Sequence, residues 1–141
     1  MSSAGRVLAV DWGRKRFGVA LSDPTRLIAQ PLTVLTRRPG KRAPVGPVLE
    51  LARKHDVTEF VVGLPLTSEG EEGEEAREAR AFGEALGARS GLKVWFVDER
   101  MSTARALRSA RETGVSAKAA RRRVDAMAAV GILQGWLDAR G

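Results

Sequence analysis

The sequence predicts an α/β domain in which helices flank a five-stranded mixed sheet. Short apolar runs alternate with longer segments of helical spacing, which is the pattern of an α/β fold. The first two runs lie so close together that they should pair as an antiparallel hairpin, because a parallel connection needs a dozen or more residues. The 141 residues match the length of one ordinary domain, so we expect a single domain over 1–141 rather than a two-lobed enzyme.

Two strands are expected at the start of the chain. Residues 6–11 form an almost continuous apolar run that ends in Asp11, which is typical of a strand buried on both faces. Residues 13–16 follow as a turn. Residues 17–23 then supply the second strand, which Pro24 ends.

The rest of the chain predicts alternating helices and strands. Residues 39–44 indicate an exposed basic loop, and glycines interrupt the acidic stretch at 68–75, which predicts a loop leading into a helix. Gly114 is well placed to end a helix that Ser102 or Thr103 can cap. The expected elements, in order, are a third strand within 28–36, a helix from about 48 to 55, a strand around 60–62, a helix at about 74–89, a strand at 92–99, and helices at about 102–113 and 116–139.

The cysteine and histidine content limits the possible chemistry. The chain has no cysteine, which excludes disulfides, thiolate metal sites and cysteine nucleophiles. Its one histidine, His55, cannot form a zinc pair or a multi-histidine copper site. A catalyst built from this sequence therefore depends on carboxylates.

The sequence lacks the features of a membrane or exported protein. No apolar stretch approaches the roughly 18–20 residues of a membrane span, and the first residues lack the charged start and apolar run of a signal peptide. We therefore expect a cytoplasmic protein with no membrane partner. No feature identifies a subunit interface, so both a monomer and a homodimer remain open.

The charge is positive and unevenly distributed. The net charge is +7, and residues 100–123 hold eight basic residues against one acidic residue, so this segment accounts for the whole excess. Such a segment favours nucleic acid as a partner, although a solvated helix face can have the same composition. The candidate contacts to nucleic-acid phosphates are Arg14, Lys15, Arg16, Arg100, Arg105, Arg108, Arg121 and Arg122.

Three carboxylates stand at positions that suggest a site. Asp11 and Glu99 each close an apolar run, where an ionised group is costly unless it has a partner or a site role. If the first and last strands run parallel, these two residues should meet at one edge of the sheet. Asp125 shares a helix face with small apolar residues that can pack closely on the sheet. Asp11, Glu99 and Asp125 are therefore the candidate catalytic and metal-binding residues.

Three carboxylates suit the hard cations Mg²⁺ and Mn²⁺, which prefer carboxylate oxygens and retained waters. A pair of such ions can activate water and stabilise the leaving oxygen of a phosphodiester. Simpler roles also fit these residues. Asp11 could initiate the hairpin turn, Glu99 could pair with a neighbouring arginine, and Asp125 could pair with Arg121 or Arg122 one turn back on its helix.

The motifs of the chain, taken in order, resemble those of the YqgF/RuvX family. The resemblance rests on residues 10–13, 16–20, 63–65, 97–103 and 124–129, which read VDWG, RFGVA, GLP, VDERMST and VDAMAA. It spans nearly the whole chain. The order of the motifs makes it specific, although each motif alone is short.

The resemblance implies a ribonuclease H-like fold, a cytoplasmic location and metal-dependent phosphodiester hydrolysis in maturation of the 5′ end of 16S rRNA. Members are also described as Holliday junction resolvases, so branched DNA is an alternative substrate. The family's acidic positions correspond to Asp11, Glu99 and Asp125. Some nucleases of this fold hold a fourth carboxylate, for which Asp98 is the nearest candidate, but strand alternation points Asp98 away from Glu99.

Two other classes of function compete with a nuclease. Asp11 and Gly13 in a hairpin followed by Gly18 resemble the first phosphate-binding hairpin of the sugar kinase and actin class, but those proteins need a second lobe. A non-catalytic RNA-binding or ribosome-assembly factor would keep the basic segment. Such a factor gains nothing from converging carboxylates, which repel phosphate unless a metal is bound, so a metal-dependent nuclease is the favoured hypothesis.

Overall fold

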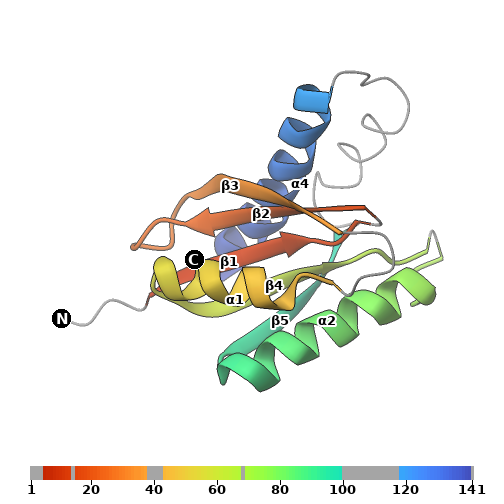
Figure 1. Ribbon diagram of the computed structural model, residues 1–141, viewed down its shortest axis with the longest axis horizontal. Coiled ribbons are helices and arrows are strands. Elements are labelled where there is room, and N and C mark those ends of the chain that lie inside the picture. Colours follow the sequence, from red (N-terminus) through yellow and green to blue (C-terminus); the bar gives the residue numbers. More distant parts are fainter. Residues whose placement is uncertain (1–4, 14, 38–42, 68, 100–117, 141) are drawn as a thin grey trace.

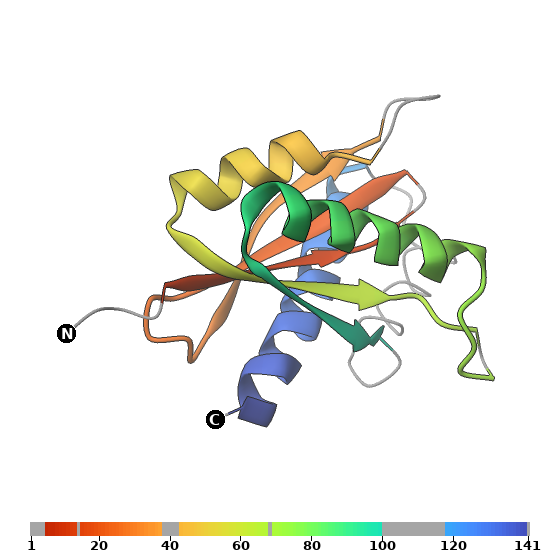
Figure 2. The same ribbon diagram turned by 90° about the horizontal axis from the view of Figure 1, so that it is seen from below.

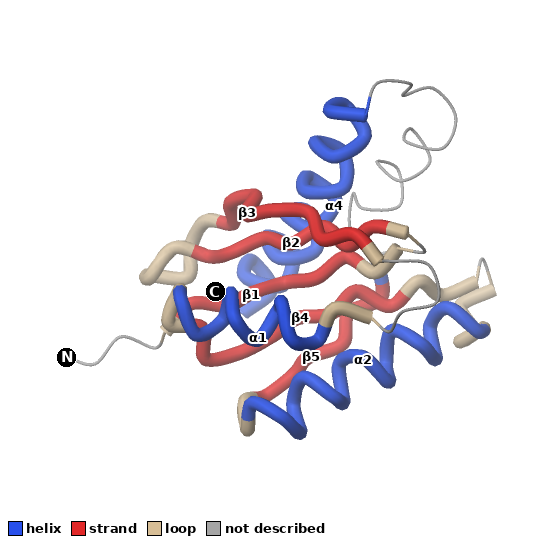
Figure 3. The backbone as a smooth tube through the Cα atoms, viewed as in Figure 1, coloured by secondary structure: helices blue, strands red, loops and turns tan. Residues whose placement is uncertain are grey.

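The computed structural model describes residues 5–13, 15–37, 43–67, 69–99 and 118–140. In these ranges one sheet lies between two layers of helices (Figures 1 and 3). The elements are β1 (Arg6–Asp11), β2 (Arg16–Ser22), β3 (Ala29–Thr36), α1 (Val45–Lys54), β4 (Val57–Leu64), α2 (Glu74–Ser90), β5 (Lys93–Asp98) and α4 (Lys118–Arg140). The helix predicted at 102–113 falls outside the described residues. Across the described ranges, no helix combines the length and apolar character needed to cross a membrane.

The sheet has five strands in the order β3-β2-β1-β4-β5. Strand β2 is antiparallel to both β1 and β3, whereas β4 is parallel to both β1 and β5. The predicted hairpin and the predicted mixed sheet are therefore confirmed. Because β1 and β5 run in the same direction, their carboxyl ends lie at the same edge of the sheet, which is where this architecture places functional groups.

The side chains of the central strand β1 alternate between the two faces of the sheet. Leu8 and Val10 pack in the core under α1 and α2, whereas Val7 and Ala9 pack in the core under α4. Figure 2 shows α1 and α2 on one side of the sheet and α4 on the other. All four side chains are fully buried, so β1 has a continuous apolar run instead of an alternating pattern. The same alternation places Asp11 on the face that α4 covers.

Two elements are longer than their apolar patterns predict. Helix α1 begins at Val45 rather than near residue 48, because Pro47 is tolerated in the first turn, where its missing N–H has no intrahelical partner. Strand β4 covers Val57–Leu64, beyond the apolar run at 60–62. Main-chain pairing with both β1 and β5 extends this strand past its most apolar part.

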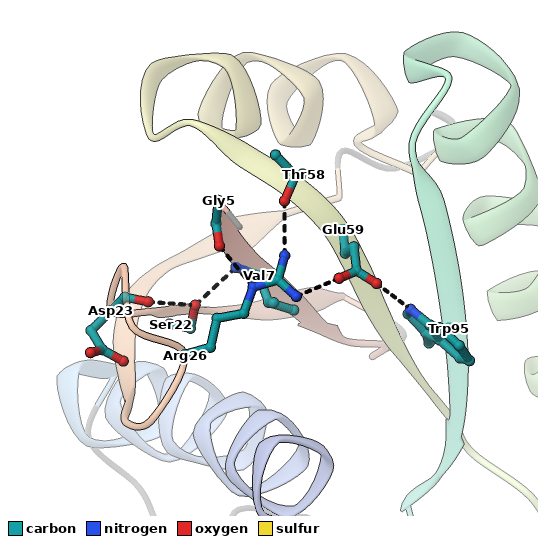
Figure 4. Close-up of polar contacts among 8 residues, drawn as sticks. All are labelled: Gly5, Val7, Ser22, Asp23, Arg26, Thr58, Glu59 and Trp95. Atoms are coloured by element: carbon teal, nitrogen blue, oxygen red, sulfur yellow. Dashed lines mark hydrogen bonds and ion pairs between the residues drawn. The ribbon is translucent and has the colours of Figure 1, made fainter. Parts of the chain in front are cut away.

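An arginine-centred network ties the amino-terminal edge of the parallel strands. Arg26, in the β2–β3 loop, donates to the carbonyl of Gly5 at 2.8 Å and to the hydroxyl of Thr58 at 2.9 Å (Figure 4). The same guanidinium donates to Oε2 of Glu59 at 2.5 Å, and Trp95 Nε1 donates to Oε1 at 2.7 Å. Partial burial acts to raise the pKa of Glu59, but the hydrogen bonds from Trp95 and Arg26 outweigh it and the pKa is lowered. The network therefore fastens the residue before β1, the β2–β3 loop, β4 and β5 together.

Candidate active site

Asp11 lies at the carboxyl end of the central strand, between two glycines. It is in register with Gly18 of β2 on one side and with Gly63 of β4 on the other. Residues in register on neighbouring strands project from the same face, so all three positions face α4. Neither neighbour has a side chain. The space above this row is therefore left to groups from other elements.

Gly18 allows the last helix to approach the sheet at Asp125. A Cβ atom on Gly18 would lie 2.0 Å from the main-chain oxygen of Asp125 in α4. Gly63 of β4 has a similar role further along α4, since a Cβ atom on Gly63 would lie 2.6 Å from Cδ1 of Ile132. A glycine within a strand commonly marks such a close approach. The two glycines therefore set how deeply α4 sits over the end of β1.

Glu99 directly follows β5 and lies on the same face as Asp11. The odd-numbered apolar side chains of β5 pack with the core under α4, and the even-numbered ones pack with the core under α1 and α2. Continuing this alternation places Glu99 on the α4 face and Asp98 on the opposite face. The surroundings of Gly63 agree, because a Cβ atom there would lie 3.9 Å from the Cβ of Glu99. Asp98 thus points away from Glu99, as the sequence predicts.

The three candidate carboxylates are buried at this edge of the sheet. Asp11 has 1% of its surface exposed, Glu99 has 5% and Asp125 has none. An ionised carboxylate loses its hydration on burial, so it needs a cation or hydrogen-bond donors in return. The structure thus brings one carboxylate from β1, one from the end of β5 and one from α4 to the same buried face.

Arg16 supplies a cation to the most deeply buried of these carboxylates. Its Nε donates to Oδ2 of Asp125 at 2.6 Å, and 26% of the Arg16 side chain remains exposed. The sequence left open an ion pair of Asp125 with Arg121 or Arg122. The partner that the structure describes comes from β2, and the side chain of Arg121 lies outside the described residues. Arg122 instead donates through Nη2 to the main-chain oxygen of Val34 at 3.1 Å. The helical spacing could not reveal a partner on a strand.

The chemistry of the donor set fits a divalent cation. Carboxylate oxygens are the protein ligands that Mg²⁺ and Mn²⁺ prefer, and three acidic groups on one buried face favour a cation strongly. However, among the residues that the structure describes, no three acidic or histidine side chains lie at ligand spacing around a common point. Binding of an ion by all three carboxylates therefore requires side-chain movement. The ion pair between Arg16 and Asp125 is one contact that stands in the way.

The structure describes few of the predicted nucleic-acid contacts. Lys15 is exposed at the turn that precedes β2. Arg121 lies in α4, but its side chain is outside the described part of the chain. Arg14, Arg100, Arg105 and Arg108 lie outside it as well. The basic segment at 100–123 therefore stays a prediction as a phosphate-binding surface.

Arg37 packs on the aromatic rings next to Asp11, a contact that the sequence did not predict. It follows β3, and its Cζ lies 4.9 Å from the ring centroid of Trp12 and 5.2 Å from that of Phe17. Trp12 is 2% exposed and packs edge-on against Phe17 with ring centroids 5.0 Å apart. Trp12 is thus a core residue beside Asp11, and its ring is not available for stacking on a base.

A separate groove lies on the other face of the sheet. It has a volume of about 640 Å³ and runs between β3 and α1, with Leu32, Leu35 and Leu51 among its lining residues. None of the three candidate carboxylates lines it. The groove is therefore not part of the candidate active site.

Comparison with known proteins gives a family match over most of the chain. Residues 5–139 match the model of a family described as "RuvX: Holliday junction resolvase". A protein of Anaeromyxobacter sp. (strain Fw109-5) is 47% identical over 135 residues, which cover 96% of this chain and 98% of the relative. A protein of Roseiflexus sp. (strain RS-1) is 42% identical over 139 residues, covering 99% and 98% of the two chains. Both relatives carry the name "Putative pre-16S rRNA nuclease".

A solved structure confirms the fold. RuvC of T. thermophilus, in a complex with a Holliday junction substrate, superposes with a TM-score of 0.59 at 17% identity and covers 96% of this chain and 95% of its own. A second RuvC structure, from Thermus thermophilus, gives a TM-score of 0.56 at 19% identity with the same coverage. At this identity the likeness concerns the fold alone, which is ribonuclease H-like.

Proposed function

The chain belongs to the RuvX family, and from this premise we propose that it is a metal-dependent nuclease that matures the 5′ end of pre-16S rRNA in the cytoplasm. One observation carries the proposal. Asp11, Glu99 and Asp125 come from three elements and are buried on one face at the carboxyl edge of the sheet. A protein that only binds RNA has no use for three buried acids beside a polyanion.

Asp11, Glu99 and Asp125 are the residues that would hold Mg²⁺ or Mn²⁺. A divalent ion bound there supplies activated water at neutral pH and a Lewis acid for the phosphoryl oxygens. The chain itself holds one of the three carboxylates in a fixed position, because Asp11 belongs to the central strand. Gly18 and Gly63 have no side chains of their own and leave the positions on either side of Asp11 to α4, which approaches there with Asp125 and Ile132.

Basic side chains beside the carboxylates would hold the phosphate backbone. Lys15 is exposed at the turn next to the site, and Arg16 is partly exposed at the start of β2. Contacts of this kind position a nucleic acid without reading its sequence. The predicted contacts from Arg100, Arg105, Arg108, Arg121 and Arg122 would extend the same surface.

The relatives favour an RNA substrate, and the family description favours a DNA junction as the second candidate. The relatives quoted above are named for pre-16S rRNA. The family description and the RuvC complex name the Holliday junction. Resolution of a four-way junction needs two active sites, and therefore a dimer, whereas trimming of an RNA end needs one.

A cleavage assay on matched substrates tests the proposal. End-labelled RNA with the 16S 5′-precursor sequence, DNA of the same sequence and a four-way DNA junction are each incubated with Mg²⁺, Mn²⁺ or a chelator. We expect cleavage of the RNA that needs the metal and is lost in Asp125→Asn. Asp138→Asn, an exposed acid between three and four turns further along α4, is the matched control and should cleave normally.

The outcomes separate the candidate functions. Selective cleavage of the junction, together with a dimer by light scattering, would replace the RNA assignment with junction resolution. Salt-sensitive RNA binding by the wild type and Asp125→Asn, without cleavage by either, would favour a non-catalytic assembly factor. Cleavage that persists in Asp125→Asn would refute the proposed carboxylate site.

A further inference from the structure

Arg16 reaches Asp125 because of the alternation along β2. Positions 16, 18 and 20 of this strand face α4, as the packing of Ala20 in the core under α4 shows. Gly18 has no side chain, so α4 descends onto the strand at that point. The side chain of Arg16, one pleat earlier, therefore lies against the carboxylate of Asp125, from which it is separated by 109 residues of sequence.

The contact joins a partly exposed cation to a fully buried anion. Asp125 has no exposed surface, whereas 26% of the Arg16 side chain is exposed. At 2.6 Å the Nε–H to Oδ2 contact is a short, charge-assisted hydrogen bond, which offsets the lost hydration of the carboxylate. Arg16 thus lies between solvent and the buried oxygen. The Arg16 side chain can withdraw to solvent. Asp125 cannot, because it is buried between α4 and the sheet.

A guanidinium and a divalent ion compete for the same oxygen. No three of the described acidic or histidine side chains lie at ligand spacing, so the carboxylates must change position to enclose an ion. Oδ2 of Asp125 has its hydrogen bond from Arg16 in this arrangement. An ion that takes this oxygen must also overcome repulsion by the guanidinium charge.

We propose that Arg16 is the resident counter-ion of Asp125 and that it leaves Oδ2 when a divalent cation binds. The inference rests on the proposed metal-dependent function and adds a gating role for one residue. Arg16 lowers the affinity for the ion and keeps the buried carboxylate neutralised until the ion arrives. It is a positioning residue in this role, because it acts through Asp125.

Calorimetric titration with Mn²⁺ tests the proposal without any measurement of cleavage. The proteins are the wild type, Arg16→Gln and Lys15→Gln, the last of which removes the neighbouring exposed positive charge without touching Asp125. We expect Arg16→Gln to bind Mn²⁺ about tenfold more tightly or better, since the lost contact is a charge-assisted hydrogen bond. Lys15→Gln should change the affinity much less. Equal or weaker binding by Arg16→Gln, or no binding by any of the proteins, would overturn the proposal.

A measurement on the unaltered chain covers the case in which Arg16→Gln does not fold without the ion. The Nε–H proton of Arg16 should give a resolved NMR signal that exchanges slowly while it is bonded to Asp125. Addition of Mg²⁺ should shift this signal and speed its exchange with water, whereas the Nε–H of Arg26, bonded to the Gly5 carbonyl, should not change. An unchanged Arg16 signal at saturating Mg²⁺ would show that Arg16 stays on Asp125. Failure of the proposed nuclease function appears separately, as absence of RNA cleavage.

Discussion

A Cβ atom on Gly18 would lie 2.0 Å from the main-chain oxygen of Asp125. The central hairpin and the last helix thus meet backbone to backbone at the position that carries a candidate catalytic carboxylate. Neighbouring atoms would also be crowded, because the same Cβ would lie 2.7 Å from the carbonyl carbon of Asp125. Main-chain atoms cannot turn aside as the end of a flexible side chain can.

Gly18→Ala should therefore destabilise the protein and displace α4. Overpacking of this kind typically costs about 1–3 kcal/mol, and a clash with helix backbone should reach the upper part of that range. Urea denaturation measures the loss. Gly135→Ala is the control within α4, because a Cβ there has nothing within 4 Å, and it should stabilise the helix by about 0.5–1 kcal/mol. Equal stability of Gly18→Ala and the wild type would contradict the close contact.

Adjacent acids at the end of β5 should differ sharply in their effect on activity. Glu99 lies on the face of Asp11 and α4, and Asp98 lies on the other face. Loss of an electrostatic group at a reaction centre commonly costs on the order of a hundredfold or more in rate. We expect Glu99→Gln to lose RNA cleavage to this extent and Asp98→Asn to retain most of it, as measured by single-turnover kinetics. Similar losses in both variants would exclude the assignment by face.

The Arg26–Glu59 pair should show measurable coupling. Both side chains are about one-fifth exposed, and Glu59 also accepts from Trp95. A double-mutant cycle with Arg26→Ala and Glu59→Gln should give roughly 1–2 kcal/mol of coupling in unfolding experiments. The exposed pair Arg53–Glu50 provides the comparison and should give only about 0.3–0.5 kcal/mol. Equal coupling in the two pairs would show that the network of Figure 4 contributes no more than a surface ion pair.

Asp23 should make the protein more stable above about pH 4 than below it. The N–H of Ile28, the hydroxyl of Thr25 and the N–H groups of Leu27 and Thr25 lower the pKa of Asp23 from 3.8 to about 2. Because the folded pKa is depressed, the stabilisation is fully present above the unfolded value and is lost as the pH falls through about 2. The stability difference between the wild type and Asp23→Ala, followed by urea denaturation from pH 6 to pH 2, should shrink toward the acid end. A difference that does not vary with pH would contradict this.

Much of the sheet could be predicted because the strands are recognisable from short stretches of the sequence. Apart from Asp11, every buried position in the run at 6–11 is apolar, and the short turn after it leaves only an antiparallel pairing for the next strand. Strand ends then placed Asp11 and Glu99 at one edge, because β1 and β5 both run parallel to β4. The alternation that separates Glu99 from Asp98 also follows from the local pattern.

The parts that could not be predicted depend on tertiary contacts. Gly18 and Gly63 stand in motifs of the sequence, but no local pattern predicted that a helix would pack on them, because that depends on how α4 crosses the sheet. The ion pair between Arg16 and Asp125 could not be predicted either, because 109 residues separate the two in the chain. Arg26 has a φ of 62°, a left-handed backbone conformation that the local sequence did not predict. This conformation accompanies its hydrogen bonds to the residues of Figure 4.

The late position of α4 in the sequence also sets the order in which the candidate site is assembled during synthesis. The ribosome makes β1 and β5 well before it makes Asp125, so a growing chain carries Asp11 and Glu99 but lacks the third carboxylate. Arg16 likewise has no contact with Asp125 until that residue has been synthesised, because 109 residues separate the two. The candidate site of the proposed nuclease is therefore completed only after Asp125 has been synthesised and α4 has packed on the sheet.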